Sequence, residues 1–470
     1  MTQSMWTPFF TAYDPGPKSD GSIDPLGLQA DASRLADLLL PGFTVRMERL
    51  RTLTVSAFVL EASRQIAGDS ENVLPYRLAL ERTIAAALAK GVDRTTDPPI
   101  RGYPGRLKAV SAKAHGDPLT PERYIRGPAT NGVVGVYAKL ARAGGLVNDD
   151  LKLEPRGYSL LDVWERDCKQ SLRDAGPGAA KSSVRKALER TVARDVEEGR
   201  VDPKPDVEDA IFRGLRLDKG GTTERKTLEA ALMDPATGVQ PRVLKLLRRS
   251  LQREADAKRA GDDDLAEAAW RGETEYRIVA NWQKLQGSAQ DAIVATVARA
   301  IVAYERVAEH VLAPFEAFRW LARTSQEPFL QLAAIDEDRR TGRIARTSME
   351  ELPEAFERLQ QAVDAVLALP EKPCSWGRTP GAIRASIDSL AAFASSRASG
   401  ADLLQALVVR HLEVQRIKRK GSWLLEQGHA FRFIAGPPIT SEKPRQASGR
   451  SFIHAFRLTN AISILEDLGG

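Results

Sequence analysis

Apolar residues recur with a helical period over about one hundred residues in the second half of the chain. The patterns TLEAALM, VLKLLRRSLQREA and AIVATVARAIVAYERVAEHVLAPFEAF lie between residues 223 and 325, with apolar side chains every three or four positions. The polar stretches QPR, AGDDD and QGS interrupt them. A helix with one apolar face must bury that face against another element, so we expect antiparallel helices packed side by side. No repeat of fixed period is evident in the sequence, which disfavours a solenoid.

The composition agrees with a mainly α fold, because aromatic residues make up only 6% of the chain while alanine, leucine and arginine are abundant. At 470 residues the chain is longer than the chains that usually fold around a single hydrophobic core. We therefore predict a multi-domain helical protein of four segments. They are an N-terminal helical domain (1–100), a winged helix-turn-helix module with a basic arm (101–175), a helical bundle (176–400) and a C-terminal helix-hairpin-helix element of α+β character (401–470).

Local signals predict several further elements. The pair Pro41-Gly42 ends one helix and allows the next to begin near Thr44. Short alternating runs around Gly428 predict a small hairpin. Helical spacing also predicts helices over 71–90, 183–198, 349–369, 401–416 and 452–468.

The sequence favours a cytoplasmic protein outside the membrane. Cys168 and Cys374 are the only cysteines, and they lack the spacing of a zinc site or a disulfide framework. The N-terminal residues show no basic cap followed by an apolar run, so we expect no signal peptide. No stretch approaches the roughly 18 uninterrupted apolar residues of a membrane span.

Residues 119–168 alternate helix, turn and hairpin signals. Thr120 and Thr130 are suited to cap two short helices, and the second helix places Val133 and Tyr137 on one apolar face. The pair Gly144-Gly145 then supplies a helix stop. The runs GLV and LKL follow, joined by Asn-Asp-Asp, and YSLLDVWERDC resumes helical spacing.

Over about 50 residues this order resembles the winged-helix superfamily, in which a glycine-terminated helix leads to a strand pair. The resemblance implies that the second helix enters the major groove of DNA. Winged helices also serve as platforms for protein partners, so both functions stay open.

The positive charge of the chain is concentrated in two segments. Residues 101–200 contain 19 basic against 13 acidic residues, and residues 401–470 contain 10 against 6, while the whole chain has a net charge of +6. The affinity for a polyanion depends on such local clusters of cations, and not on the average charge of the whole chain. Lys139 and Arg142, taken singly, are equally compatible with a solvated helix surface, and the basic residues at 416–420 also complement a helix dipole. The predicted nucleic-acid-binding residues are Arg101, Arg106, Lys108, Lys113, Asn131, Lys139, Arg142, Arg416, Lys418, Arg419 and Lys420.

No complete catalytic motif is found in the sequence. The stretch GPGAAKSS fails as a phosphate-binding loop because Ala175 and Ala180 stand where that motif needs glycine. The five histidines lack metal-binding spacing. The string Asp218, Glu224 and Lys226 is only loosely nuclease-like, because no strand is predicted to present it. We predict no metal or cofactor.

A second resemblance covers DPLGLQADASRLADLLLPGFTVRMERLRTLTVSAFVLEASR, residues 24–64. It is similar to the opening of a family of uncharacterised bacterial proteins found in phage-defence gene clusters, which also end on a HAFRL-like segment. The matching positions are Pro41, Gly42, Thr44, Arg49 and Arg51, whereas Leu53 stands where the family often has tyrosine or phenylalanine. The resemblance implies a defence role beside other subunits, with no activity assigned.

Together these features predict a DNA-binding accessory subunit of a bacterial multi-protein anti-phage system, with double-stranded DNA and other defence proteins as partners and without catalysis. Two alternatives remain: a scaffold that binds protein only, and a nuclease whose dispersed site the sequence does not reveal.

Overall fold

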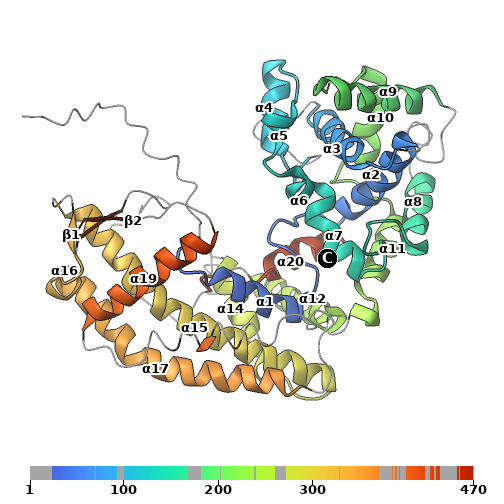
Figure 1. Cartoon of the computed structure of the whole chain (residues 1–470). Coiled ribbons are helices and arrows are strands. Elements are labelled where there is room, and N and C mark those ends of the chain that lie inside the picture. Colours follow the sequence, from blue (N-terminus) through green and yellow to red (C-terminus); the bar gives the residue numbers. More distant parts are fainter. Residues whose placement is uncertain are drawn as a thin grey trace, which may run out of the picture.

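A computed structural model describes residues 24–68, 70–90, 92, 100–167, 182–201, 203–237, 240–259, 271–325, 327, 329–369, 384, 387–388, 391, 399–418, 424–427, 430–433, 452–454 and 456–468. The described part is mainly helical, which confirms the mainly α character predicted for the chain. Figure 1 shows the helices arranged in two lobes, with α1 (Gln29–Leu39), α12 (Gln240–Arg259) and α20 (Leu458–Asp467) lying between them.

The first lobe is built from short and medium helices that follow one another along the chain. They are α2 (Thr52–Ala67), α3 (Leu74–Leu88), α4 (Arg106–His115), α5 (Pro121–Tyr124), α6 (Pro128–Asn131), α7 (Val133–Ala143), α8 (Pro155–Asp167), α9 (Ser183–Glu198), α10 (Pro205–Leu215) and α11 (Thr222–Leu232).

The second lobe is organised around two long helices, α15 (Ala289–Thr324) and α17 (Arg339–Leu367), which pack along each other. Its other elements are α14 (Arg271–Trp282), α16 (Ala334–Glu337), α19 (Gly400–Lys418) and the strands β1 (Leu330–Gln331), β2 (Leu424–Gln427) and β3 (Ala430–Phe433). A 3₁₀ turn at Pro235–Thr237 leads into α12. Of the helices predicted within residues 223–325, α14 and α15 pack on each other as expected, whereas α17 comes from later in the chain.

A small antiparallel sheet caps one end of α15, with the strand order β1-β3-β2. The pairing of β2 with β3, in which Leu424 is opposite Phe433, confirms the hairpin predicted around position 428. β1 adds an edge strand through Leu330 opposite Phe431, which the sequence analysis did not predict.

One hydrophobic core cluster runs through both lobes. Helices α3, α9 and α10 pack together, α8 packs on α11, and α1 packs on α15. This packing crosses the predicted boundaries near residues 100 and 175. That the predicted boundaries separate units that fold independently therefore stays a prediction.

Two helices begin later than the sequence predicts, because side chains elsewhere hold their N-terminal residues in turns. The helix expected from Thr44 begins at Thr52, since Asp467 accepts hydrogen bonds from Leu50 N (2.8 Å) and from the side chain of Arg49 (2.6 Å). The helix expected from Phe452 begins at Leu458, since residues 453 and 454 bind Glu305 instead.

Some residues singled out in the sequence fall outside the described residues: Cys168, Cys374, residues 176–181 of the rejected GPGAAKSS stretch, and the predicted DNA contacts Arg419 and Lys420. Among the described helices, none combines the length and the apolar character that a bilayer crossing demands.

Candidate nucleic-acid interface

The segment predicted to be a winged helix keeps the expected order of elements, from α5 to α8. Its hairpin is reduced to one antiparallel bridge between Val147 and Leu153. Asn148 closes the loop, because its side chain accepts a hydrogen bond from Lys152 N (2.9 Å) and its backbone N–H donates to Lys152 O (2.9 Å). The predicted second helix is divided at Gly132 into α6 and α7, where a β-carbon would lie 2.1 Å from the carboxylate of Glu81.

Helix α7, the expected recognition helix, is mostly enclosed by the protein. Lys139 is its only exposed residue, and the described neighbours pack against the other sides. Gly42, at φ +85°, brings its backbone so close that a β-carbon there would lie 2.9 Å from Leu140 Cα. A helix that reads a major groove needs a free face with several side chains. α7 offers one.

The N-terminus of α7 is capped by a buried carboxylate. Glu81 accepts hydrogen bonds from Val133 N (2.9 Å) and Val134 N (3.3 Å). Burial nevertheless raises the pKa of Glu81 from 4.5 to about 7, and the two backbone hydrogen bonds and Arg77 lower it only in part.

We expect Glu81 to make the protein less stable as the pH rises from about 5 to 8. Its folded pKa lies above the unfolded value, so the folded state holds the proton more tightly, and this stabilisation is lost as the pH passes through about 7. Relative to Glu81→Gln, the wild type should lose about 3 kcal/mol of unfolding free energy over that range. Denaturant titrations of both proteins at several pH values measure it, and parallel curves would contradict it.

The predicted basic arm is largely helical, and most of its cations contact carboxylates. Arg106 Nη1 lies 2.9 Å from Glu48 Oε2, and Arg101 Nε lies 4.0 Å from the same oxygen. Lys113 forms an ion pair with Glu208. Lys108 is exposed on α4 without a hydrogen bond or ion pair to other described residues.

The predicted contacts around α7 are also engaged within the chain. Arg142 donates to the backbone oxygen of Asp149 (3.0 Å), and its Nε lies 3.8 Å from the carboxylate of Asp149. Asn131 donates to the backbone oxygen of Arg126 (2.6 Å) and accepts a hydrogen bond from Arg46. Lys139 is exposed.

The C-terminal cations lie on α19, in the other lobe from α4 and α7 (Figure 1). Lys418 Nζ pairs with Asp24 Oδ2 at 2.9 Å, whereas Arg416 is exposed. The two predicted sets of cations are therefore not brought together into one surface.

A set of cations that the sequence analysis missed lies on α9. Lys186, Arg190 and Arg194 recur every four residues along the exposed side of the helix, and none has a hydrogen bond or ion pair to a described residue. We call them the α9 stripe. The opposite side of α9 is buried against the lobe, where Arg185 donates to Glu189 (2.9 Å) and Gln65 (3.2 Å). The signal was visible in the sequence as a basic residue at every fourth position.

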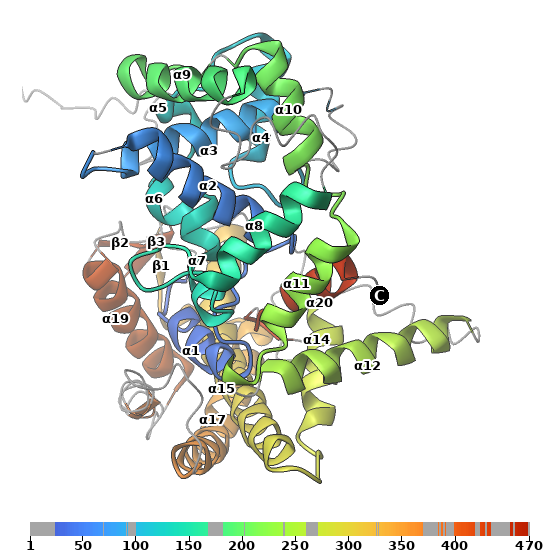
Figure 2. The same ribbon diagram turned by 90° about the vertical axis from the view of Figure 1, so that its right-hand side faces the viewer.

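Helix α12 has the same residue types at the same spacing, namely Lys245, Arg249 and Arg253, also exposed and without a described partner. Figure 2 shows α9 at the far end of the first lobe and α12 projecting sideways from the region between the two lobes. The α12 cations stand in a segment, residues 201–300, with 17 basic and 17 acidic residues.

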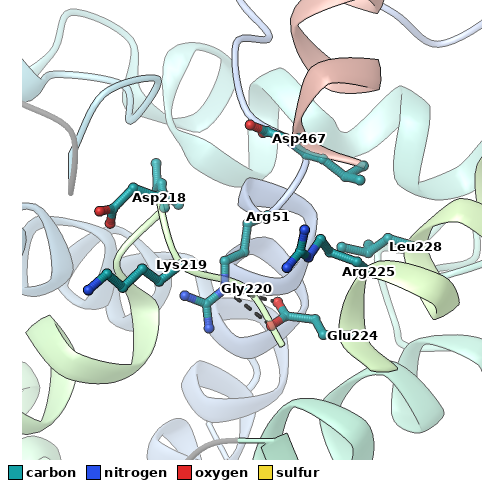
Figure 3. A pocket seen from close by; sticks show the side chains of 10 residues that line it. Arg51, Asp218, Lys219, Gly220, Glu224, Arg225, Leu228 and Asp467 are labelled. Carbon is teal, nitrogen blue, oxygen red and sulfur yellow. Dashed lines mark hydrogen bonds and ion pairs between the residues drawn. The ribbon is translucent and has the colours of Figure 1, made fainter. Parts of the chain in front are cut away.

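The weak nuclease-like string does not form a metal site. Glu224 faces Arg51 in a cavity of about 380 Å³ (Figure 3), with Arg51 Nε 3.1 Å from Glu224 Oε1. Asp218 pairs with Arg216 at 2.6 Å, and Lys226 does not line the cavity. No group of three potential metal ligands was found among the described residues.

Comparison of the chain with protein-family models, with curated protein sequences and with solved structures found no match.

Proposed function

We propose that the protein binds duplex DNA through its phosphate backbone, without catalysis and without reading base sequence, and that the α9 stripe makes the contact. The observation that carries this proposal is three exposed cations in one row that lack carboxylate partners among the described residues. Four-residue spacing places them over about 12 Å of helix. Duplex DNA presents about seven phosphates over that length.

Helix stability does not explain the stripe. Like charges four residues apart destabilise a helix, by about 0.2–0.5 kcal/mol per pair. The charge order along α9 also opposes the helix dipole, because Lys186 lies near the N-terminus while Glu197 and Glu198 lie in the last turn. The same cost applies to the row on α12, but only α9 lies in the segment with the larger positive surplus, residues 101–200, which favours an external polyanion at α9.

An alternative is that the winged-helix segment contacts DNA bases in the major groove, and this alternative has less support. Its expected cations contact Glu48, Glu208 and Asp149 of the same chain, and its second helix exposes only Lys139. Membership of an anti-phage complex is a further part of the proposal, and it rests on the resemblance of residues 24–64.

The salt dependence of duplex binding tests the proposal. Three phosphate contacts should make the affinity fall roughly 40-fold between ~50 and ~200 mM monovalent salt, equally for unrelated duplex sequences. Fluorescence anisotropy with two labelled duplexes of different sequence measures this. Absence of binding at ~50 mM salt, or binding that salt leaves unchanged, would refute the proposal.

A further inference from the structure

A pocket of about 680 Å³ lies where α2, α3, α8 and the loop of residues 148–153 meet. We call it the hairpin pocket. Its walls are largely apolar and partly open to solvent: Leu74 is 41% exposed and Tyr158 is 44% exposed. Tyrosine and arginine side chains beside a concave surface are typical of the places that dominate binding between proteins.

Arg77 gives the hairpin pocket a half-buried positive charge. Its Nε is buried and has no hydrogen-bond partner, and no ion pair of Arg77 is found among the described residues. Desolvation lowers the pKa of Arg77, which Glu81 raises only in part. The carboxylate of Glu81 is occupied by the backbone of α7. Arg77 is half-buried, so its guanidinium is partly withdrawn from water, and an anion brought to it would offset part of that desolvation cost.

The other charged groups of the hairpin pocket are less suited than Arg77 to pair with an incoming anion. Arg64 and Glu61 pair with each other at 2.7 Å. Asp150 and Lys152 lie on the loop, where both are exposed and opposite in sign. Among the charged residues that line the pocket, Arg77 is therefore the partly desolvated one without an ion pair to a described residue.

The loop wall is held in a particular shape. Leu151 has φ +61°, a left-handed conformation that costs a leucine about 1 kcal/mol or more. Its side chain lines the pocket together with Leu153. The hairpin thus contributes apolar surface to a concave site.

We propose that the hairpin pocket binds a segment of a partner protein in which an aspartate or glutamate stands next to a large apolar side chain. The carboxylate pairs with Arg77, and the apolar side chain packs against Leu74 and Tyr158. A partner protein is the occupant we infer because the apolar walls open to solvent, which suits an anchor presented from outside. This site is separate from the α9 stripe, so each proposal can fail without the other.

An array of N-acetylated, C-amidated hexapeptides tests the proposal. Each peptide carries one Asp or Glu beside Leu, Ile or Phe, and each has a counterpart with Asn or Gln. We expect a subset to bind the full-length protein, with the acidic form roughly tenfold tighter than its amide counterpart. The preference should persist in the Lys186→Gln, Arg190→Gln, Arg194→Gln variant.

Arg77→Met should abolish the acidic preference without lowering the melting temperature, because it removes an unpaired charge and keeps an apolar stem. Arg249→Met, the same change at an exposed cation of α12, should preserve the preference. Three outcomes would overturn the proposal: no peptide preferred over its amide counterpart, a preference retained in Arg77→Met, or a lower melting temperature of that variant, which would assign Arg77 to structure instead.

Discussion

Replacing Lys186, Arg190 and Arg194 together with glutamine is expected to remove most of the duplex binding of the protein. If each cation neutralises one phosphate, the slope of log affinity against log salt should become shallower by about 3. At ~50 mM salt the affinity should fall roughly 100-fold or more for every duplex sequence alike. The three side chains are exposed and lack described partners, so the circular dichroism spectrum and the melting temperature should stay close to those of the wild type.

The chain offers a matched control for this experiment. Replacing Lys245, Arg249 and Arg253 with glutamine removes one lysine and two arginines at the same spacing, on a helix that lies apart from α9. Both triple variants lower the formal net charge from +6 to +3. If α9 is the contact, the α12 variant should bind within a few-fold of the wild type. Equal losses in the two variants would show that binding follows net charge and not a surface on α9.

Much of the secondary structure could be predicted from the sequence, because its signals are local. The predicted span of α9, 183–198, matches the structure, and the glycine pair at 144–145 follows the end of α7. The break at Gly132 could not be predicted in the same way. It depends on the approach of the Glu81 carboxylate, which is 52 residues away in the sequence from Val133.

The candidate site was harder to predict because a charge count records which cations exist and not what they contact. The excess of basic residues in 101–200 is real, yet Arg106 meets Glu48, 58 residues away, and Lys113 meets Glu208, 95 residues away. Such pairs depend on the tertiary fold. Lys186, Arg190 and Arg194 belong to the same excess, but they lie outside the winged-helix segment, where the sequence analysis placed the contact.

The opening segment, residues 24–64, and the closing segment at Arg457 connect distant parts of the chain. In the opening segment, Arg49 pairs with Asp467 at 2.6 Å and Arg51 pairs with Glu224. In the closing segment, Arg457 pairs with Asp37. These arginines therefore have a structural explanation, and we do not assign them to the DNA contact.

Glu224→Ala is expected to destabilise the protein strongly, because it leaves Arg51 buried without its carboxylate. The two side chains are only 7% and 1% exposed, and Arg51 also donates to Gly214 O at 2.8 Å. Removing one partner of such a buried pair should cost about 3–5 kcal/mol of unfolding free energy. Glu354→Ala breaks the exposed pair of Glu354 with Arg358 and should cost less than about 1 kcal/mol. Urea unfolding of both variants measures the contrast.

The double variant Arg51→Met, Glu224→Met separates two quantities. One is the cost of leaving a buried charge unpaired, and the other is the contribution of the intact ion pair to the free energy of unfolding. Apolar side chains of similar length leave no buried ion, although Arg216 O then loses the Arg51 donor and Gly214 O keeps Trp164 Nε1 at 3.0 Å. The double variant should therefore be more stable than Glu224→Ala, by about 1–3 kcal/mol. If it were the less stable of the two, the pair itself, with its carbonyl contacts, would be the main stabilising feature, and the desolvation argument would fail for Arg51.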